Sequence, residues 1–163
     1  SINLADTFAF TGTVTGAGES NSPYFRAYIT SASDLSNNTT TKVEYDTLSW
    51  NVGGTYSTTD FRWTPGVQGR YFINAQVTMD WSDGAGDRID LIIRKNGSNN
   101  IYRRIGSGGN FGVESSTVVS GTVDLDSNDY VEVFVEQESG STKAYNPASS
   151  EYCFWEGFLI ATY

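Results

Sequence analysis

The run of residues 70–81 constrains the fold of this chain more than any other feature, because its side chains alternate strongly in character. One side of the run carries Tyr71, Ile73, Ala75, Val77 and Met79, and the other side carries Phe72, Asn74, Gln76 and Thr78. A period of two is that of a β-strand with one buried face, whereas a helix would scatter these positions around its circumference. We therefore expect a long strand that lies against a hydrophobic core.

Shorter segments with strand character recur along the chain, with turn-forming residues between them. Further strands are expected at residues 24–30, 42–50, 61–64, 88–97, 99–106, 114–125, 130–137 and 154–163. Asn96-Gly97 indicates a tight hairpin turn. Loops are expected where the sequence is polar or rich in glycine, at residues 31–40, 51–60, 106–112 and 138–151. About ten short strands without a convincing helix predict an all-β fold, a two-sheet antiparallel jelly-roll sandwich.

The length of the chain predicts one domain with a short connector before it. A chain of 163 residues can bury one sizeable apolar core without disulfides or a metal. Residues 1–23 are rich in glycine, threonine and serine, and we interpret them as a linker that contains one strand, Thr7 to Thr15. Residues 24–163 then form the globular domain.

Charge and residue types exclude several classes of function. The net charge of −9 disfavours nucleic acid as a partner, because such a chain repels phosphate. No segment approaches the roughly 20 apolar residues of a membrane-spanning helix. The chain has no histidine that could activate its single cysteine, Cys153, and no G-x-S-x-G motif. We therefore expect no enzyme, and we expect Cys153 to be a buried, unreactive thiol.

Seven positions between residues 45 and 73 follow a fixed spacing of aromatic, asparagine and glycine residues: Tyr45, Asn51, Tyr56, Trp63, Gly69, Tyr71 and Ile73. The pattern is similar to the signature of the complement C1q globular-head family, which shares a superfamily with the tumour-necrosis-factor-like jelly rolls. Tyr45 and Trp63 stand where that family usually has Phe, and Ile73 replaces another aromatic residue. The strands that begin at Phe25 and Phe154 also resemble the first and last strands of the family.

The resemblance covers residues 24–163, and it implies a jelly roll of about ten strands that assembles as a homotrimer. In such folds the terminal strands are neighbours, and here both carry large apolar side chains. The candidate trimer-interface residues are Tyr24, Tyr28, Tyr152, Phe154, Phe158, Ile160 and Tyr163. The alternative is that these residues belong to the core of a single domain.

The expected loops are rich in Asn, Ser, Gly and Tyr, a mixture that suits polar contacts with aromatic anchors. The candidate ligand-binding residues lie in or near these loops: Trp50, Trp81, Tyr102, Arg103, Phe111 and Tyr145. Arg103, which Arg104 follows, is a candidate for contact with an anionic ligand, and the alternative is a solvated strand end.

An acidic cluster is the stronger of two candidates for a metal site, although the fold requires no cofactor, and the turn at Asp124 to Asp129 is the weaker one. Asp80, Asp83 and Asp87 lie around two glycines, with Asp90 close behind, and calcium prefers several oxygen ligands on such a loop. The spacing is not that of an EF-hand, and a solvated turn is the alternative.

The chain shows no collagen stalk, has a single cysteine and is rich in Thr, Asn, Ser and Gly. Its first residues resemble short strands of bacteriophage fibre and virion proteins. These features favour a homotrimeric phage fibre, spike or virion-surface module that attaches to a host-surface receptor, for example a glycan. The alternatives are a trimeric capsid decoration protein and a secreted ligand related to C1q or tumour necrosis factor.

Overall fold

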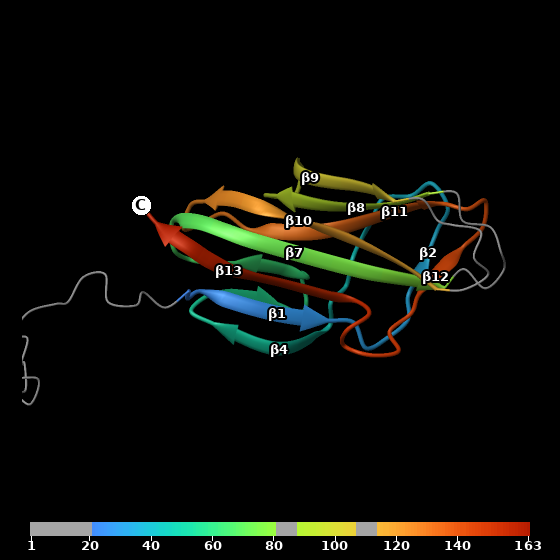
Figure 1. Cartoon of the computed structure of the whole chain (residues 1–163), viewed down its shortest axis with the longest axis horizontal. Coiled ribbons are helices and arrows are strands. Elements are labelled where there is room, and N and C mark those ends of the chain that lie inside the picture. Colours follow the sequence, from blue (N-terminus) through green and yellow to red (C-terminus); the bar gives the residue numbers. More distant parts are fainter. Residues whose placement is uncertain (1–20, 81–87, 107–113) are drawn as a thin grey trace, which may run out of the picture.

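The computed structural model describes residues 21–80, 88–106 and 114–163, and these residues form thirteen β-strands and no helix (Figure 1). Among them, no helix has the length and apolar character needed to cross a membrane. In chain order the strands are β1 Tyr24–Tyr28, β2 Asp34–Leu35, β3 Thr41–Lys42, β4 Thr47–Val52, β5 Thr55–Ser57, β6 Arg62–Thr64, β7 Gly69–Asp80, β8 Arg88–Lys95, β9 Asn99–Gly106, β10 Ser115–Leu125, β11 Val131–Glu138, β12 Lys143–Tyr145 and β13 Phe154–Thr162.

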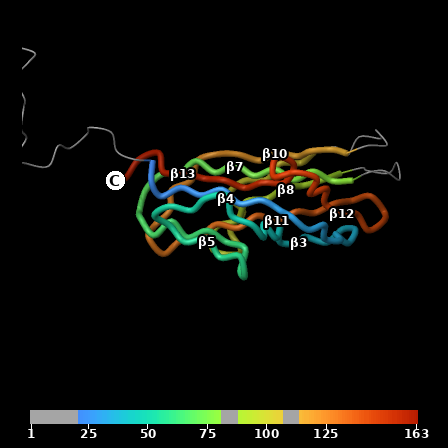
Figure 2. Tube along the Cα trace, turned by 90° about the horizontal axis from the view of Figure 1, so that it is seen from below, coloured from blue at the N-terminus to red at the C-terminus, as the bar shows by residue number. Residues whose placement is uncertain are grey.

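The strands build two antiparallel sheets. The seven-stranded sheet runs β4-β1-β13-β7, with β10 also paired to β7, and β12 and β2 extend it beside the end of β7. The six-stranded sheet runs β5-β6-β11-β8-β9, and β3 pairs with β11. The long strands of both sheets follow the long axis of the molecule (Figures 1 and 2). The expected jelly-roll sandwich is therefore confirmed, with the first and last strands, β1 and β13, as direct neighbours.

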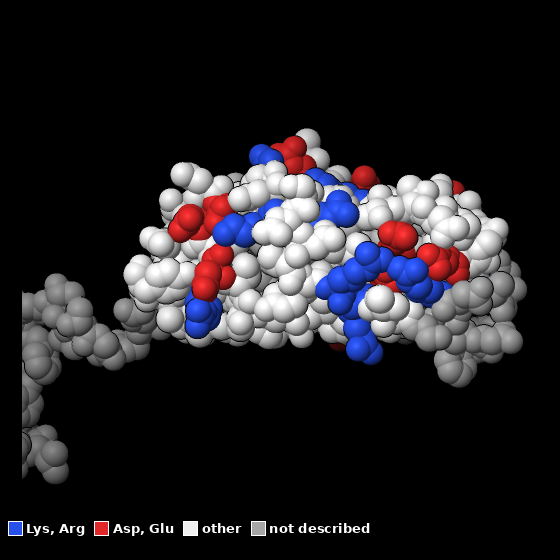
Figure 3. Space-filling view, turned by 90° about the horizontal axis from the view of Figure 1, so that it is seen from above, with Lys and Arg blue, Asp and Glu red and all other residues white. Residues whose placement is uncertain are grey.

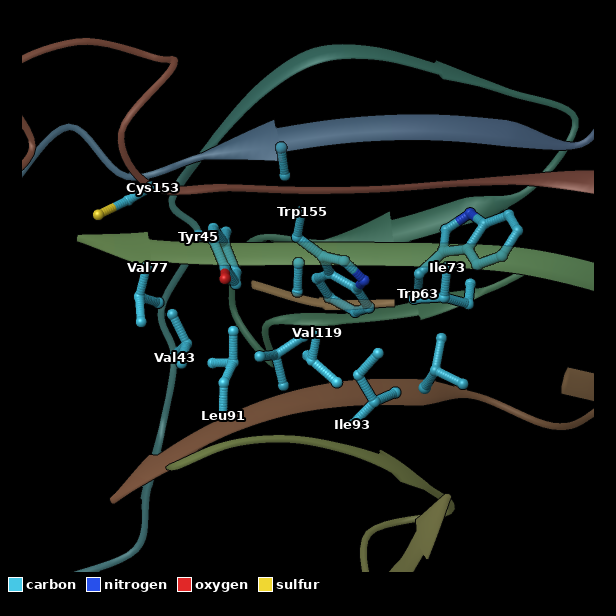
Figure 4. Packing of buried hydrophobic residues seen from close by; sticks show 14 of the residues in the cluster. Val43, Tyr45, Trp63, Ile73, Val77, Leu91, Ile93, Val119, Cys153 and Trp155 are labelled. Atoms are coloured by element: carbon cyan, nitrogen blue, oxygen red, sulfur yellow. The ribbon is translucent and has the colours of Figure 1, made fainter. Parts of the chain in front are cut away.

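The core lies between the two sheets and is rich in aromatic rings. Phe25 stacks on Trp63 with ring centroids 4.5 Å apart and meets the edge of Trp155 at 4.9 Å. Trp63 and Trp155 are fully buried, and Figure 4 shows them among the aliphatic side chains that both sheets contribute. The predicted inner side of β7, from Tyr71 to Met79, is also fully buried. These aromatic residues maintain the fold, since none of the three is open to solvent.

Two glycines permit close packing of strands. A Cβ at Gly157 would lie 3.0 Å from the Phe72 carbonyl oxygen and 3.1 Å from the Phe25 ring, and this is the close approach expected of a glycine within a strand. Gly69 likewise has no room for a side chain, because a Cβ would lie 2.6 Å from the Ala161 carbonyl oxygen. Close packing therefore explains Gly69 better than the freedom of a tight turn.

Several boundaries differ from the sequence-based predictions. The expected strand at 42–50 is two strands in different sheets, because the chain crosses the sandwich between β3 and β4 while Val43 and Tyr45 enter the core. The expected loop at 51–60 contains the end of β4 and all of β5, with a turn at Gly53 where φ is +74°. The loops at 31–40 and 138–151 contain the short paired strands β2 and β12.

The hairpin predicted at Asn96-Gly97 is confirmed. It joins β8 to β9, and both turn residues adopt positive φ, 54° at Asn96 and 81° at Gly97. The connector prediction for residues 1–23, including the strand Thr7 to Thr15, lies almost wholly outside the described residues. Its last part contacts the domain, because the backbone N–H of Leu159 donates to the carbonyl oxygens of Asn21 and Pro23.

Candidate functional site

The outer face of the seven-stranded sheet, which we call the sheet face, carries adjacent large apolar side chains. Antiparallel register places Tyr24 directly between Val52 and Phe158, and Phe158 beside Phe72 at a ring-centroid distance of 5.5 Å. Residues that stand directly opposite one another point to the same side of a sheet. The most exposed apolar side chains here are Leu48, Trp50, Val52, Val118, Phe158 and Ile160, each between 37% and 49% exposed. The sheet face is therefore an apolar surface that spans five neighbouring strands.

An ion pair crosses the middle of the sheet face. The Arg26 guanidinium donates to Glu156 at 2.6 Å, and the other carboxylate oxygen of Glu156 accepts a hydrogen bond from the Asn74 amide at 3.2 Å. The same guanidinium lies 4.2 Å from the Phe154 ring centroid and 5.9 Å from that of Trp50. Both charged groups thus have partners within the chain.

The seven predicted interface residues are all at least partly accessible, so they are not the core of this single chain. Tyr24, Tyr28, Phe154, Phe158 and Ile160 lie on β1 and β13, where alternation places them outward. Tyr152 precedes β13 and packs against the core, and Tyr163 follows β13 and is 66% exposed. Sequence reasoning did not include Leu48, Val52, Phe72 or Val118, although the outward side of the alternating run already contained Phe72.

The predicted ligand-binding residues do not form one site. Trp50 belongs to the sheet face, where it lines a cavity of about 250 Å³ with Tyr24, Glu156 and Phe158. Tyr102 and Arg103 lie together on β9, far along the chain from Trp50, and line a separate groove against β10. Trp81 and Phe111 lie outside the described residues.

The prediction that Tyr145 contacts a ligand is wrong for this chain, because Tyr145 is only 3% exposed and belongs to the core. The segment around it looked like a polar loop. In the structure, however, Tyr145 pairs with Met79 of β7, and this pairing turns the ring inward.

The groove between β9 and β10 has a volume of about 590 Å³. The two strands are edges of different sheets and make contact at two points. At one end, the Tyr102 ring lies over Gly121, where a Cβ would be 2.2 Å from the ring, and its hydroxyl donates to the Thr122 carbonyl oxygen. At the other end, a Cβ at Gly106 would lie 2.8 Å from the Thr117 hydroxyl oxygen. These contacts close the groove at both ends and leave it open between them.

Arg103 borders the groove, but its guanidinium is hydrogen-bonded to a buried carboxylate. Asp90 is fully buried, and it accepts hydrogen bonds from the Arg88 Nε at 2.9 Å and from the Arg103 Nε at 2.8 Å. Burial alone would raise the pKa of Asp90, but the two guanidinium groups outweigh it and hold that pKa below its ordinary value. Arg103 is therefore already neutralised within the chain, contrary to the role expected for it with an anionic ligand.

The predicted calcium site is not assembled from the described residues. Asp83 and Asp87 lie outside them, Asp80 ends β7 on the surface, and Asp90 is occupied by Arg88 and Arg103. In residues 21–80, 88–106 and 114–163 no group of three or more acidic or cysteine side chains could hold a metal ion.

Cys153 is fully buried, as expected, and its thiol accepts from the Thr78 N–H at 3.2 Å. Burial raises the pKa of the thiol to about 11, so that it remains protonated at neutral pH.

Comparison with solved structures identifies the architecture. The Eiger tumour necrosis factor of S. frugiperda superimposes with a TM-score of 0.63 at 13% identity, covering 86% of this chain and 92% of that one. Murine APRIL gives a TM-score of 0.64 at 13% identity, covering 84% and 98%. The globular domain of the zebrafish complement 1qA protein gives 0.60 at 14% identity, covering 86% and 99%. This chain has the tumour-necrosis-factor and C1q jelly-roll fold.

The likeness lies in the fold, since the sequences agree at only 13–14% of positions. No protein-family model matches the sequence, and no curated protein matches it. The jelly-roll fold therefore determines which faces and edges the chain presents, whereas the fold alone does not determine function.

Proposed function

We propose that the chain is a non-enzymatic binding module that assembles into a homotrimer through the sheet face. The single observation that carries this proposal is the continuous row of exposed apolar residues across neighbouring strands, with Val52, Tyr24, Phe158 and Phe72 side by side. Exposed apolar surfaces of this kind usually mark a protein interface. The occupant that we propose is a second copy of this chain, because no segment of residues 21–80, 88–106 and 114–163 covers these side chains.

The ion pair between Arg26 and Glu156 in the middle of the sheet face is compatible with burial in an interface. Burying a charged side chain is costly when its partner is missing. Here Arg26 and Glu156 already pair with each other. Asn74 donates a further hydrogen bond to Glu156, and two aromatic rings lie against the Arg26 guanidinium. Assembly would therefore bury a paired group, not an isolated charge.

A trimer of this kind presents the six-stranded sheet and the connecting loops outward, where a receptor can bind. Three identical sites on one particle raise the overall avidity without any new contact. We propose attachment of a phage fibre, spike or other virion-surface protein to a host-surface receptor, and this proposal is supported by the composition of the chain and by the resemblance of its first residues to virion proteins.

The second candidate is a secreted ligand, and the likeness to a tumour necrosis factor, APRIL and a complement domain favours it. In an extracellular protein the sequon Asn38-Thr39-Thr40 would be open to glycosylation, because Asn38 is exposed. The side chain of Asn96, in another sequon, is hydrogen-bonded to Asp129 and to the Tyr130 N–H. Glycosylation of native protein at Asn38 would support the secreted ligand over the virion protein.

The substitution Phe158→Asp tests the proposed assembly. It places a carboxylate in the middle of the sheet face, and we expect the trimer to dissociate into folded monomers. Val67→Asp is the matched control, because Val67 is 40% exposed, close to the 37% of Phe158, but precedes β7 outside the sheet face. Sedimentation velocity and circular dichroism measure mass and fold together. An unchanged mass for folded Phe158→Asp would contradict the proposal.

Binding to a receptor is tested with the wild-type chain on an array of glycans and on whole host cells. Binding that weakens by orders of magnitude when Phe158→Asp makes the chain monomeric would show that avidity carries attachment. Equal binding by the monomeric variant would contradict the multivalent mechanism.

A further inference from the structure

We infer that the groove between β9 and β10 binds an anionic oxygen group of a small ligand, such as the carboxylate or sulfate of an acidic saccharide, between Arg104 and Thr117. The groove deepens the proposed binding function by naming a site and a ligand class. It lies within one protomer, so the inference does not require the trimer. Its volume of about 590 Å³ falls within the range of small-molecule sites, roughly 300–1,000 Å³.

Register places Arg104 on the inner side of the six-stranded sheet. On β8, Leu91 and Ile93 belong to the core, and Arg104 and Tyr102 stand directly opposite them on β9. Opposed residues share a face, so Arg104 points toward the gap between the sheets and not outward. On β10, Thr117 and Val119 pair with the core residues Val77 and Ala75 and point into the same gap. Arg104 therefore faces Thr117 and Val119 across the groove.

Arg104 differs from the other cations of the chain. Eight of the ten Lys and Arg side chains have a hydrogen bond or an ion pair with another described residue, and Lys143 has an interaction of its own. Among the described residues, Arg104 has none. The chain has almost twice as many acidic as basic residues, so acidic partners are not scarce. Figure 3 looks onto the side of the sandwich that carries β9 and β10, and acidic atoms lie beside most of the basic ones there. An exposed guanidinium that lines a groove without a partner among the described residues is therefore a specific feature of this site.

The hydroxyl of Thr117 is a second, independent indication of a ligand. Thr117 is 5% exposed and lines the groove, and the described residues offer its hydroxyl no hydrogen bond. The hydroxyl oxygen is not among the enclosed, unpartnered polar atoms of the described residues, so it opens onto the groove, where a ligand can reach it. The neighbouring Ser116 hydroxyl, by contrast, already contacts the Thr78 hydroxyl at 2.7 Å.

Together these groups match the chemistry of an anionic oxygen. A guanidinium donates two parallel hydrogen bonds to a carboxylate, sulfate or phosphate, and a threonine hydroxyl can add a third. The Tyr102 ring at the end of the groove offers an apolar wall, and the exposed Ser120 hydroxyl lies along the rim. This combination suits a sugar acid better than a bare ion.

The test is an NMR titration of the ¹⁵N-labelled full chain with sodium sulfate, glucuronic acid, N-acetylneuraminic acid and neutral glucose. We expect the acids, but not glucose, to shift the amide signals of Gly106, Thr117 and Gly121, while Gly140 stays unchanged. Tighter binding of the two sugar acids than of sulfate assigns the site to an acidic saccharide. Equal binding assigns the affinity to the anionic group alone, and both results support the inference.

Variants then locate the contact. Arg104→Gln keeps the length of the side chain but removes its charge, and we expect it to weaken binding by about tenfold or more, because hydrogen bonds to charged groups are the strong ones. Thr117→Val removes only the hydroxyl and should weaken binding several-fold. Arg62→Gln is the control, since Arg62 is a partly exposed cation on β6 that pairs with Asp60.

Binding of acids and glucose alike, no shifts in the groove, or unchanged affinity in Arg104→Gln would each overturn the inference. The same titration on monomeric Phe158→Asp separates the two proposals. Retained binding there supports the groove whatever the oligomeric state, and the mass of the wild-type chain tests the trimer independently.

Discussion

Gly121→Ala should destabilise the chain, and the cause should be the Tyr102 ring, which lies over that position. A Cβ at Gly121 would be 2.2–2.6 Å from three ring atoms of Tyr102, a distance that forces the ring to move. Tyr102 is half-buried on an edge strand, so the ring can swing outward. The substitution would then remove the packing of the ring and its hydrogen bond to the Thr122 carbonyl oxygen.

The expected cost follows from what the ring contributes. Deleting a fully buried aromatic side chain costs about 3–5 kcal/mol, and a half-buried ring on this basis contributes about 2 kcal/mol, hydrogen bond included. Alanine offsets about 0.5–1 kcal/mol of this loss, because glycine within a strand loses more conformational entropy on folding than alanine does. We therefore expect Gly121→Ala to lower the free energy of unfolding by about 1–2 kcal/mol.

A double-mutant cycle makes this reasoning testable. In a Tyr102→Ala background no ring lies over Gly121, so Gly121→Ala should stabilise the chain by about 0.5–1 kcal/mol, a reversal of sign. Urea unfolding of the four variants, at one fixed protein concentration because self-association adds to stability, gives the coupling energy. If Gly121→Ala destabilises equally with and without the ring, the described contact between β9 and β10 is wrong.

Two further predictions concern buried groups. Because burial raises the pKa of Cys153 to about 11, Ellman's reagent at mildly alkaline pH should react with the folded chain far more slowly than with the chain in urea, and equal rates would contradict the burial. Asp90→Asn should lower the free energy of unfolding at neutral pH by about 2–3 kcal/mol, because Arg88 and Arg103 lose a shared carboxylate. The folded pKa of Asp90 lies below its ordinary value of 3.8, so this stabilisation is complete above that pH and is lost as the pH falls through the folded pKa. The difference between wild type and Asp90→Asn, measured by urea unfolding, should therefore shrink only in strong acid, and a difference that shrinks near neutral pH would refute the assignment.

The long strands could be predicted because their alternation extends over many residues. β7, β11 and the β8–β9 hairpin each carry a repeated pattern or a turn with a positive-φ requirement, and the structure confirms all three. The short strands β2 and β12 could not be predicted, since two or three paired residues carry no period. Tyr145 was misplaced for this reason, because its inward direction depends on pairing with β7 and not on its polar neighbours.

The candidate sites were predictable only in part. The sequence identified the terminal strands as carriers of outward aromatic residues, because alternation on each strand separates Tyr24 from Phe25 and Phe154 from Trp155. It could not show that β4 and β7 continue the same apolar face, since strand order in a sheet is a property of the tertiary fold. The groove depends on two edges of different sheets, and so neither Thr117 nor Gly121 could be linked to Tyr102 beforehand.

Sedimentation equilibrium of the unmodified chain over a range of concentrations shows whether copies of the chain associate through the sheet face. The expected mass is three times the 17.8 kDa of one chain, and it should fall to that of one chain in Phe158→Asp. A wild-type chain that sediments as a single 17.8 kDa species at every concentration would show that the apolar face is not covered by further copies.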